Sequence, residues 1–331
     1  MQGHSTDLHD DITDVAGIQV GHASDPVAKT GVTVILPAGA VCAGAHIGGS
    51  ASSTRQMDSL KPLHLVDRIH GICLCGGSAF GLDAAGGVMT YLEGRGIGIP
   101  VTGKTIPIVP TAVIFDLNFG DGSIRPSWAM GFQACENASS GPMEQGSTGA
   151  GTGATVGKLL GIEHAMKGGV GSASAVSDDL VVGALVVVNA YGDIIDMDGR
   201  ILAGVRTSPT SLEPADAVRL LKEGKAVSRR VSIENTTLAV VAANAQFDQI
   251  VAVRIARQAT LGLGMVIRPF HTHIDGDLTI VLSAGDQEVD ASRIGLIAME
   301  VLQRAVIKAV CQADGFGILP SCRDPVAGRS A

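Results

Sequence analysis

Residues 180–189 (LVVGALVVVN) form an apolar run with no charged side chain and no polar one before its last position. Ten residues suit a strand, whereas a helix that crosses a bilayer needs about 20. A strand without alternating polar residues must be covered on both faces. The chain is therefore expected to build layers on either side of a sheet.

Shorter patterns fill the rest of the chain. Alternating or β-branched segments bounded by Gly or Pro predict further strands, and apolar residues at helical spacing predict helices. We expect strands at 31–36, 71–75, 111–117, 237–243 and 278–283, helices at 79–95, 246–258 and 291–311, and a helix flanked by surface loop within 206–235. Strands mixed with helices throughout indicate an α/β fold.

The sequence also predicts which faces of two helices are buried and how firmly the last segment is attached. The buried faces are expected to hold Phe247, Ile250, Val251 and Ile255 in the first helix and Ile294, Ile297, Val301, Leu302 and Ala305 in the second. The Gly- and Pro-rich segment from Asp314 onward is expected to be loosely attached.

Composition narrows the class of protein. The 331 residues are 46% hydrophobic, enough for one large domain, and only 3% aromatic, so the core must come from Val, Ile, Leu and Ala. The 44 glycines follow no period and suggest tight turns and close backbone approach. A net charge of -8 without a basic run argues against nucleic acid or anionic membranes as partners.

The location expected from the sequence is the cytoplasm. The first residues, Met1 to Asp14, are polar and acidic, unlike a secretion signal. The six cysteines form no paired framework, which is typical of thiols in a reducing compartment.

Three motifs resemble a phosphate loop, a nucleophile elbow and a metal site, but each lacks residues that such a site requires. Residues 149–158 (GAGTGATVGK) lack a phosphate loop's register, since Thr152 stands where its first glycine belongs and Leu159 where its hydroxyl belongs. Residues 76–80 (GGSAF) miss the final glycine of a nucleophile elbow. His271 and His273 alternate with Asp275 and Asp277 but lack a metal-ligand framework. We expect neither metal nor cofactor.

A change from charged to apolar sequence occurs at Asn235-Thr236-Thr237, directly before the apolar residues 238–243. By itself, a pair of threonines entering a strand is typical of β-propensity. Successive strand residues face opposite sides, so only one of Thr236 and Thr237 can enter a site.

This junction, with five other features in order, resembles the L-aminopeptidase/D-esterase family, which includes β-peptidyl aminopeptidases and nylon-oligomer endo-hydrolases. The resemblance covers residues 11 to about 313. Its marks are 14–22 (DVAGIQVGH), 76–83 (GGSAFGLD), 150–158 (AGTGATVGK), Asn189, 235–245 (NTTLAVVAANA) and 269–277 (PFHTHIDGD).

The resemblance implies a self-processing hydrolase with an N-terminal nucleophile. Its fold would be a four-layer α/β/β/α sandwich, formed by one domain spanning 1–331. Autocleavage between Asn235 and Thr236 would give chains 1–235 and 236–331, and Thr236 would attack amide substrates through an acyl-enzyme. The freed α-amine, with an ordinary pKa of about 7.7–8.0, could act as base. The resemblance also implies a homo-oligomer. Thr237 stays the alternative candidate for the nucleophile.

Supporting roles follow by position in the resemblance. Asn189 matches an oxyanion-stabilising amide, Lys158 a cation near the nucleophile, and Asp275 and Asp277 acceptors for the nucleophile and its amine. From the residues alone, Asn189 equally fits a strand-end turn, Lys158 a solvated lysine, and the two aspartates a turn.

Weaker candidates for substrate contacts are Phe115, Gly77 and Ser78. Relatives often carry tyrosine at the position of Phe115, and phenylalanine cannot donate a hydrogen bond. Two alternatives stay open: an acyltransferase of the ornithine acetyltransferase type, whose Lys-Gly-Ser/Ala-Gly-Met signature is missing at the junction, and a catalytically silent ligand-binding protein.

Overall fold

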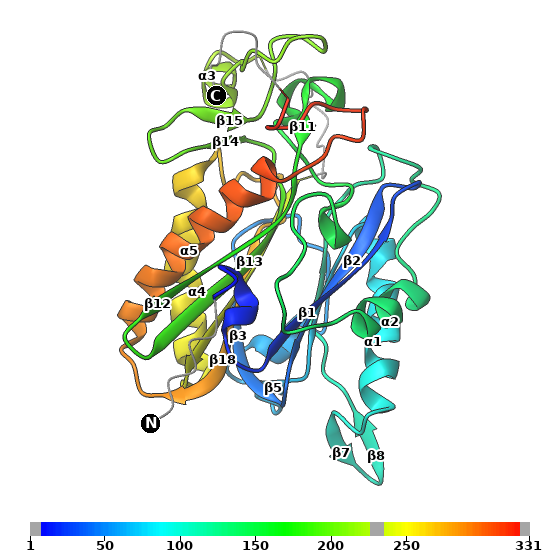
Figure 1. The fold of residues 1–331 in the computed structure, drawn as a ribbon, viewed down its shortest axis with the longest axis vertical. Helices are drawn as coiled ribbons and strands as arrows, with labels where there is room; N and C mark the ends of the chain where they lie inside the picture. The colour runs from blue at the N-terminus through cyan, green and yellow to red at the C-terminus, as the bar shows by residue number, and fades with distance from the viewer. Residues whose placement is uncertain (1–7, 226–234, 325–331) are drawn as a thin grey trace.

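The computed structural model describes residues 8–225 and 235–324. Two sheets lie face to face, and a pair of helices covers the outer side of each (Figure 1). The α/β/β/α sandwich expected from the sequence is therefore confirmed.

The first sheet holds the candidate site. Its six strands, in spatial order, are β12 (Gly169–Ser177), β13 (Leu180–Asn189), β16 (Thr236–Ala245), β18 (Leu278–Gln287), β3 (Val41–Ile47) and β5 (Arg68–Ile69). Neighbouring strands are antiparallel except β16 and β18, which run parallel. The apolar run that predicted a covered strand is β13, at the expected bounds.

The second sheet is shorter and lies on the other side of the inner core. Its strands, in order, are β1 (Ile18–Asp25), β2 (Thr30–Pro37), β6 (Ile72–Cys75), β9 (Thr111–Val113) and β4 (Thr54–Arg55). The strand predicted over 111–117 ends at Val113; beyond it, the backbone oxygen of Phe115 accepts a hydrogen bond from Asn189 instead of pairing in the sheet.

Helices α4 (Gln249–Val266) and α5 (Ala291–Cys311) cover the first sheet, and α1 (Ala84–Glu93) and α2 (Trp128–Glu136) cover the second. The bounds of α5 are those predicted. The α4 helix begins after Asp248, whose side chain accepts a hydrogen bond from the Val251 amide at 2.8 Å and so caps the helix. Residues 79–95 divide into a 3-10 helix, η3 (Ser78–Asp83), and α1.

Three apolar cores hold the four layers together. One lies between α4, α5 and the first sheet, one between the two sheets, and one between the second sheet and α1 and α2. The α5 stripe predicted from sequence packs into the first core. In α4, however, Ile250 is 52% exposed, so its place in the predicted stripe was wrong.

Glycines let the helices approach the sheets closely. A Cβ added to Gly171 on β12 would lie 2.1 Å from the carbonyl oxygen of Ala305 in α5. A Cβ on Gly21 in β1 would lie 2.0 Å from the carbonyl oxygen of Ala134 in α2. Both helices therefore pack backbone against backbone where these glycines stand, which accounts for part of the high glycine content.

Small elements complete the chain. The β strands are β7 (Ile99–Val101) with β8 (Lys104–Ile106), β10 (Thr155–Val156) with β11 (Met166–Lys167), and β14 (Asp193–Ile195) between β15 (Ile201–Ala203) and β17 (Ile267–Arg268). The helix expected within 206–235 is α3 (Ala217–Lys222); residues 226–234 of that prediction lie outside the described chain. The remaining 3-10 helices are η1 (Ile12–Asp14), η2 (Met57–Leu60), η4 (Gly149–Gly151), η5 (Lys158–Leu160) and η6 (Ile162–His164).

The segment after α5 is attached to the body of the protein, contrary to expectation. Leu319 is buried in a small cluster with Phe119 and Ala165. The carbonyl of Pro320 accepts a hydrogen bond from the Lys167 amide at 2.8 Å. Figure 1 shows this segment in red, next to β11. Gly and Pro content alone therefore misjudged residues 314–324.

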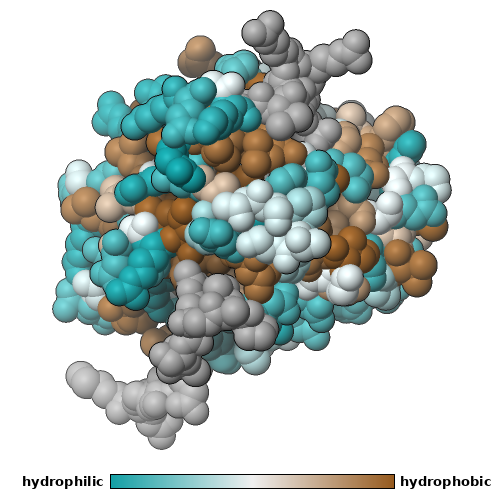
Figure 2. All heavy atoms as spheres, turned by 90° about the horizontal axis from the view of Figure 1, so that it is seen from above, coloured by the Kyte–Doolittle hydropathy of each residue, from teal (hydrophilic) through white to brown (hydrophobic). Residues whose placement is uncertain are grey.

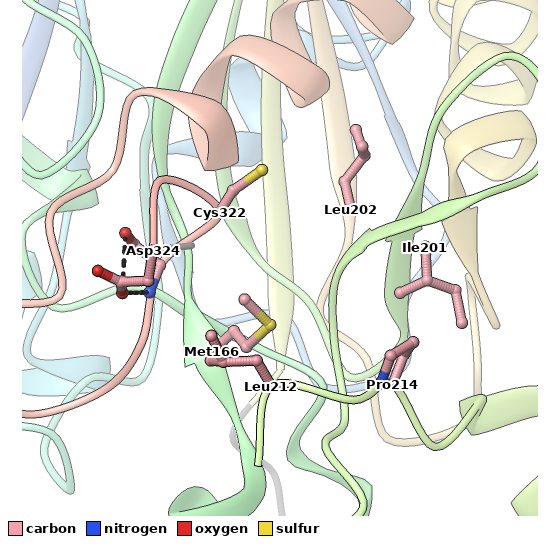
Figure 3. Close-up of a pocket in the computed structure, with 8 residues that line it drawn as sticks. Met166, Ile201, Leu202, Leu212, Pro214, Cys322 and Asp324 are labelled. Atoms are coloured by element: carbon pink, nitrogen blue, oxygen red, sulfur yellow. Dashed lines mark hydrogen bonds between the residues drawn. The ribbon is translucent and has the colours of Figure 1, made fainter. Parts of the chain in front are cut away.

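A small cavity lies at the same end of the molecule (Figure 3). It has a volume of about 30 Å³, and its lining includes Met166, Leu202, Pro214 and Cys322. This volume is room for water and not for a peptide. Figure 2 views the end from above and shows hydrophobic residues exposed between hydrophilic ones.

Candidate active site

Thr236 and Asn189 lie side by side on neighbouring strands of the first sheet. They pair directly in the antiparallel ladder of β13 and β16. Both are buried, with 6% and 0% of their surface exposed. Since Leu238 and Val187, two residues away on their strands, belong to the core between the sheets, alternation places both side chains on that inner face. Thr237 falls on the opposite face, covered by helices.

The Asn235–Thr236 peptide lies at the start of β16 with its carbonyl next to the threonine hydroxyl. Oγ1 of Thr236 donates to the carbonyl oxygen of Asn235 at 2.6 Å. The same oxygen accepts the backbone N–H of Gly276 at 2.8 Å, and Asn235 forms a parallel bridge with Asp275. The Thr236 hydroxyl therefore lies beside the Asn235–Thr236 peptide, the bond predicted from the sequence to be cleaved.

Lys158 and Asn189 form a buried polar pair. The Lys158 ammonium donates to Oδ1 and to the backbone oxygen of Asn189, at 2.9 and 3.1 Å, and to the oxygen of Thr155 at 2.8 Å. Thr155 N–H also donates to Oδ1 of Asn189, at 3.0 Å. These donors fix the amide so that its Nδ2 points away from them. Lys158 is thus not a solvated lysine, since only 8% of it is exposed.

Nδ2 of Asn189 donates to the backbone oxygen of Phe115 at 3.1 Å. Phe115 therefore contacts the candidate site through its main chain, which a tyrosine would present equally. The two other weak candidates, Gly77 and Ser78, donate their backbone N–H groups to Asp116 and Ile114. Their role in binding substrate stays a prediction.

Asp275 is a buried carboxyl with one engaged oxygen. Its Oδ2 accepts the amide and the hydroxyl of Thr272, both at 2.8 Å, while Oδ1 has no hydrogen-bond partner among the described residues. Burial, with the nearby charge of Asp277 as the second cause, raises the pKa of Asp275 to about 6. A carboxyl of this kind can change its charge near neutral pH.

Asp277 holds the backbone beside the candidate nucleophile. Its Oδ1 accepts the Thr237 amide at 2.6 Å, and its Oδ2 lies 3.1 Å from Nδ1 of His271. The bond to Thr237 fixes the start of β16 where Thr236 enters it. Asn189, Asp275 and Asp277 thus contact β16 or Asn235, and Lys158 is joined to them through Asn189.

Three further groups belong to this arrangement but were not predicted as site residues: Gly276, His271 and Thr155. Thr155 lies in the motif 150–158 and the other two lie in 269–277, so the motifs contained them. Gly276 and Thr155 act here through main-chain N–H groups, which side-chain chemistry does not reveal, whereas His271 contacts Asp277 through its ring. Within the described residues, no group of three His, Cys, Asp or Glu side chains could hold a metal ion.

Solved structures identify the class of the fold. The L-aminopeptidase D-Ala-esterase/amidase from Ochrobactrum anthropi superposes with a TM-score of 0.72, covering 98% of this chain and 93% of its own at 20% identity. Its fold is a variant of the N-terminal-nucleophile (Ntn) hydrolase fold. A β-aminopeptidase from Burkholderia sp. gives a TM-score of 0.67 at 20% identity, covering 92% and 87%. The protein therefore has an Ntn-hydrolase fold.

The chain belongs to peptidase family S58, which its sequence matches over residues 10–318. An uncharacterized aminopeptidase of Mycobacterium leprae is 36% identical over 347 residues, covering 94% of this chain and 92% of that protein. The 6-aminohexanoate-oligomer endohydrolase of Paenarthrobacter ureafaciens is 30% identical over 316 residues, covering 89% and 84%. The family expected from the sequence is confirmed, and the protein is an Ntn-type peptidase that hydrolyses amide bonds.

Among the described helices, none is both long and apolar enough to span a membrane.

Proposed function

We propose that the protein cuts its own Asn235–Thr236 peptide and then uses the freed Thr236 to hydrolyse amide substrates. The observation that carries this proposal is the buried Thr236 hydroxyl, 2.6 Å from the carbonyl oxygen of the peptide to be cut. Cleavage would yield chains 1–235 and 236–331 within a single folded domain.

In the mature enzyme, the substrate's carbonyl takes the place of the Asn235 carbonyl. Thr236 Oγ1 attacks it, and the free α-amine of Thr236 accepts the hydroxyl proton and passes it to the leaving amine. Water then releases the acyl group. Asn189, oriented by Lys158, is the amide proposed to stabilise the oxyanion.

Asp275 is proposed to receive the new α-amine. Its Oδ1 is buried without a hydrogen-bond partner among residues 8–225 and 235–324, and its backbone bridges Asn235, the residue that cleavage separates from Thr236. Asp277 keeps β16 in place through the Thr237 amide. These contacts supply an acceptor and an anchor where the new terminus forms.

The substrate class proposed is an amide of a small or unusual amino-acyl group. Support comes from relatives named as aminopeptidases and as 6-aminohexanoate-oligomer endohydrolases. We also propose a homo-oligomer, since α4 exposes Ile250, Leu261 and Met265 on its outer side. Light scattering of the purified protein measures the mass of the assembly.

Denaturing mass spectrometry tests the cleavage. The second chain holds 96 of 331 residues, or about 10 of 33.7 kDa. Wild type should give this fragment with Thr236 as its first residue, and Thr236→Ala should stay whole. Thr237→Ala is the matched control and should still split. A folded wild type that stays intact, or a cut at another bond, contradicts the proposal.

A further inference from the structure

The carbonyl of the Asn235–Thr236 peptide has a donor that is not a side chain. Its oxygen accepts the N–H of Gly276 at 2.8 Å, in addition to the Thr236 hydroxyl at 2.6 Å. When Oγ1 loses its proton and attacks, the hydroxyl no longer donates. The Gly276 N–H then remains on the oxygen that becomes negative.

The main chain around Gly276 is held in place before any reaction. The Asp277 oxygen accepts the N–H groups of Gly48 and Gly49 at 3.1 and 3.0 Å, and the Asp275 oxygen accepts that of Ala51 at 3.0 Å. The loop that carries residues 48–51 thus fixes the turn on both sides of Gly276. A donor fixed in this way needs no reorganisation as charge develops, which is the condition for strong oxyanion stabilisation.

We propose that the Gly276 N–H is the oxyanion donor for self-cleavage, an inference that rests on the proposed cleavage at Asn235–Thr236. Oγ1 of Thr236 bonds to the Asn235 carbonyl carbon, and the carbonyl π electrons move to the oxygen bonded by Gly276. Collapse of this intermediate breaks the carbon–nitrogen bond, and the proton lost by the hydroxyl ends on the nitrogen. Water hydrolyses the resulting ester to the Asn235 acid and the Thr236 hydroxyl.

The absence of a side chain at Gly276 also serves the proposed cleavage, because it leaves room for the Thr236 hydroxyl. A Cβ there would lie 2.7 Å from Oγ1 of Thr236 and 3.0 Å from the oxygen of Ala51. Gly276 does not have a positive φ, so conformational freedom does not explain its glycine. The space above its Cα is instead filled by the nucleophile, and any larger residue pushes the hydroxyl away from the carbonyl.

An exchange of the backbone amide for an ester removes the donor without changing the side chain. Glycolic acid placed at position 276 by in vitro translation puts an oxygen where the N–H was. The first-order rate of chain splitting, followed by gel electrophoresis, should fall about 100-fold or more. Glycolic acid at Gly39, in the bend between β2 and β3 where an added Cβ would meet no atom of the described chain within 4 Å, is the matched control and should leave the rate unchanged.

Gly276→Ala provides a second test through bacterial expression. It should accumulate as a whole chain that elutes and melts like Thr236→Ala, whereas Gly39→Ala should split at the wild-type rate. If the glycolate protein splits within threefold of wild type, the Gly276 donor is refuted while self-cleavage stands. If wild type itself never splits, the proposed function fails and this inference fails with it.

Discussion

Asp275→Asn should stabilise the uncut protein at neutral pH. The comparison is made in a Thr236→Ala background, so that both proteins are whole chains. An asparagine oxygen can still accept the amide and the hydroxyl of Thr272, as Oδ2 does now. What the substitution removes is a carboxylate charge in a site where only 3% of the residue is exposed.

The size of the gain follows from the pKa. Burial and the charge of Asp277 raise the pKa of Asp275 from 3.8 to about 6. A rise of about two pKa units costs the folded state about 3 kcal/mol once the group is ionised in both states. For a chain of 331 residues, this difference corresponds to about 4 °C in Tm.

The pH dependence identifies the cause. Well below pH 3.8 the carboxyl is protonated in the folded and unfolded states, and it costs nothing. Between about pH 4 and 6 the folded state binds more protons, so the Asp275 protein loses stability as pH rises. The advantage of asparagine should therefore approach its full size above pH 6 and be small by pH 4.

Calorimetric melting at pH 7.5 and at pH 4 measures both ends of this window. An asparagine variant that melts lower at pH 7.5, or whose advantage is the same at both values, refutes the reasoning. With Thr236 restored, the same substitution should slow amide hydrolysis, because an asparagine cannot carry the negative charge offered to the α-amine. Asp275→Asn should therefore raise the stability of the protein and lower its hydrolytic activity.

Three further predictions concern other parts of the chain. Lys158→Met should lower kcat/KM for an aminoacyl p-nitroanilide about 100-fold, since it removes the cation that orients Asn189, the amide proposed to stabilise the oxyanion. Gly171→Ala should cost about 2–3 kcal/mol in chemical denaturation because its Cβ meets the α5 backbone, whereas Gly39→Ala should cost almost nothing. Oxidised glutathione should join Cys311 to Cys322, whose sulfurs are 3.4 Å apart, as a disulfide found by non-reducing peptide mapping that adds about 3 kcal/mol of stability.

Secondary structure was predicted most accurately from the sequence where burial of apolar side chains alone sets the pattern. The run at β13 and the stripe of α5 were read correctly because burial alone sets their pattern. Lys158 was more difficult, since a lysine near a helix is usually solvated. Its burial depends on oxygens of Thr155 and Asn189, which lie in different segments and meet only through the fold.

Other features could not be read from side-chain chemistry. Gly276 matters through its N–H and its lack of a Cβ, and a glycine between two aspartates indicates a turn in any sequence. Ile250 fits a helical stripe by spacing, yet the position of α4 over the sheet leaves it exposed. The segment after α5 was misjudged because the contacts of Leu319 come from residues far away in sequence.

The strand order has a consequence for how the mature enzyme forms. In the first sheet, β16 and β18 follow the proposed cut, while β12 and β13 on one side and β3 and β5 on the other precede it. A single chain reaches this interleaved arrangement in a unimolecular reaction. Once cut, an unfolded enzyme could return to it only by a bimolecular encounter that slows with dilution. Cleavage would thus make folding effectively irreversible. The lifetime of the mature enzyme would be set by its unfolding rate and not by an equilibrium with its separated chains.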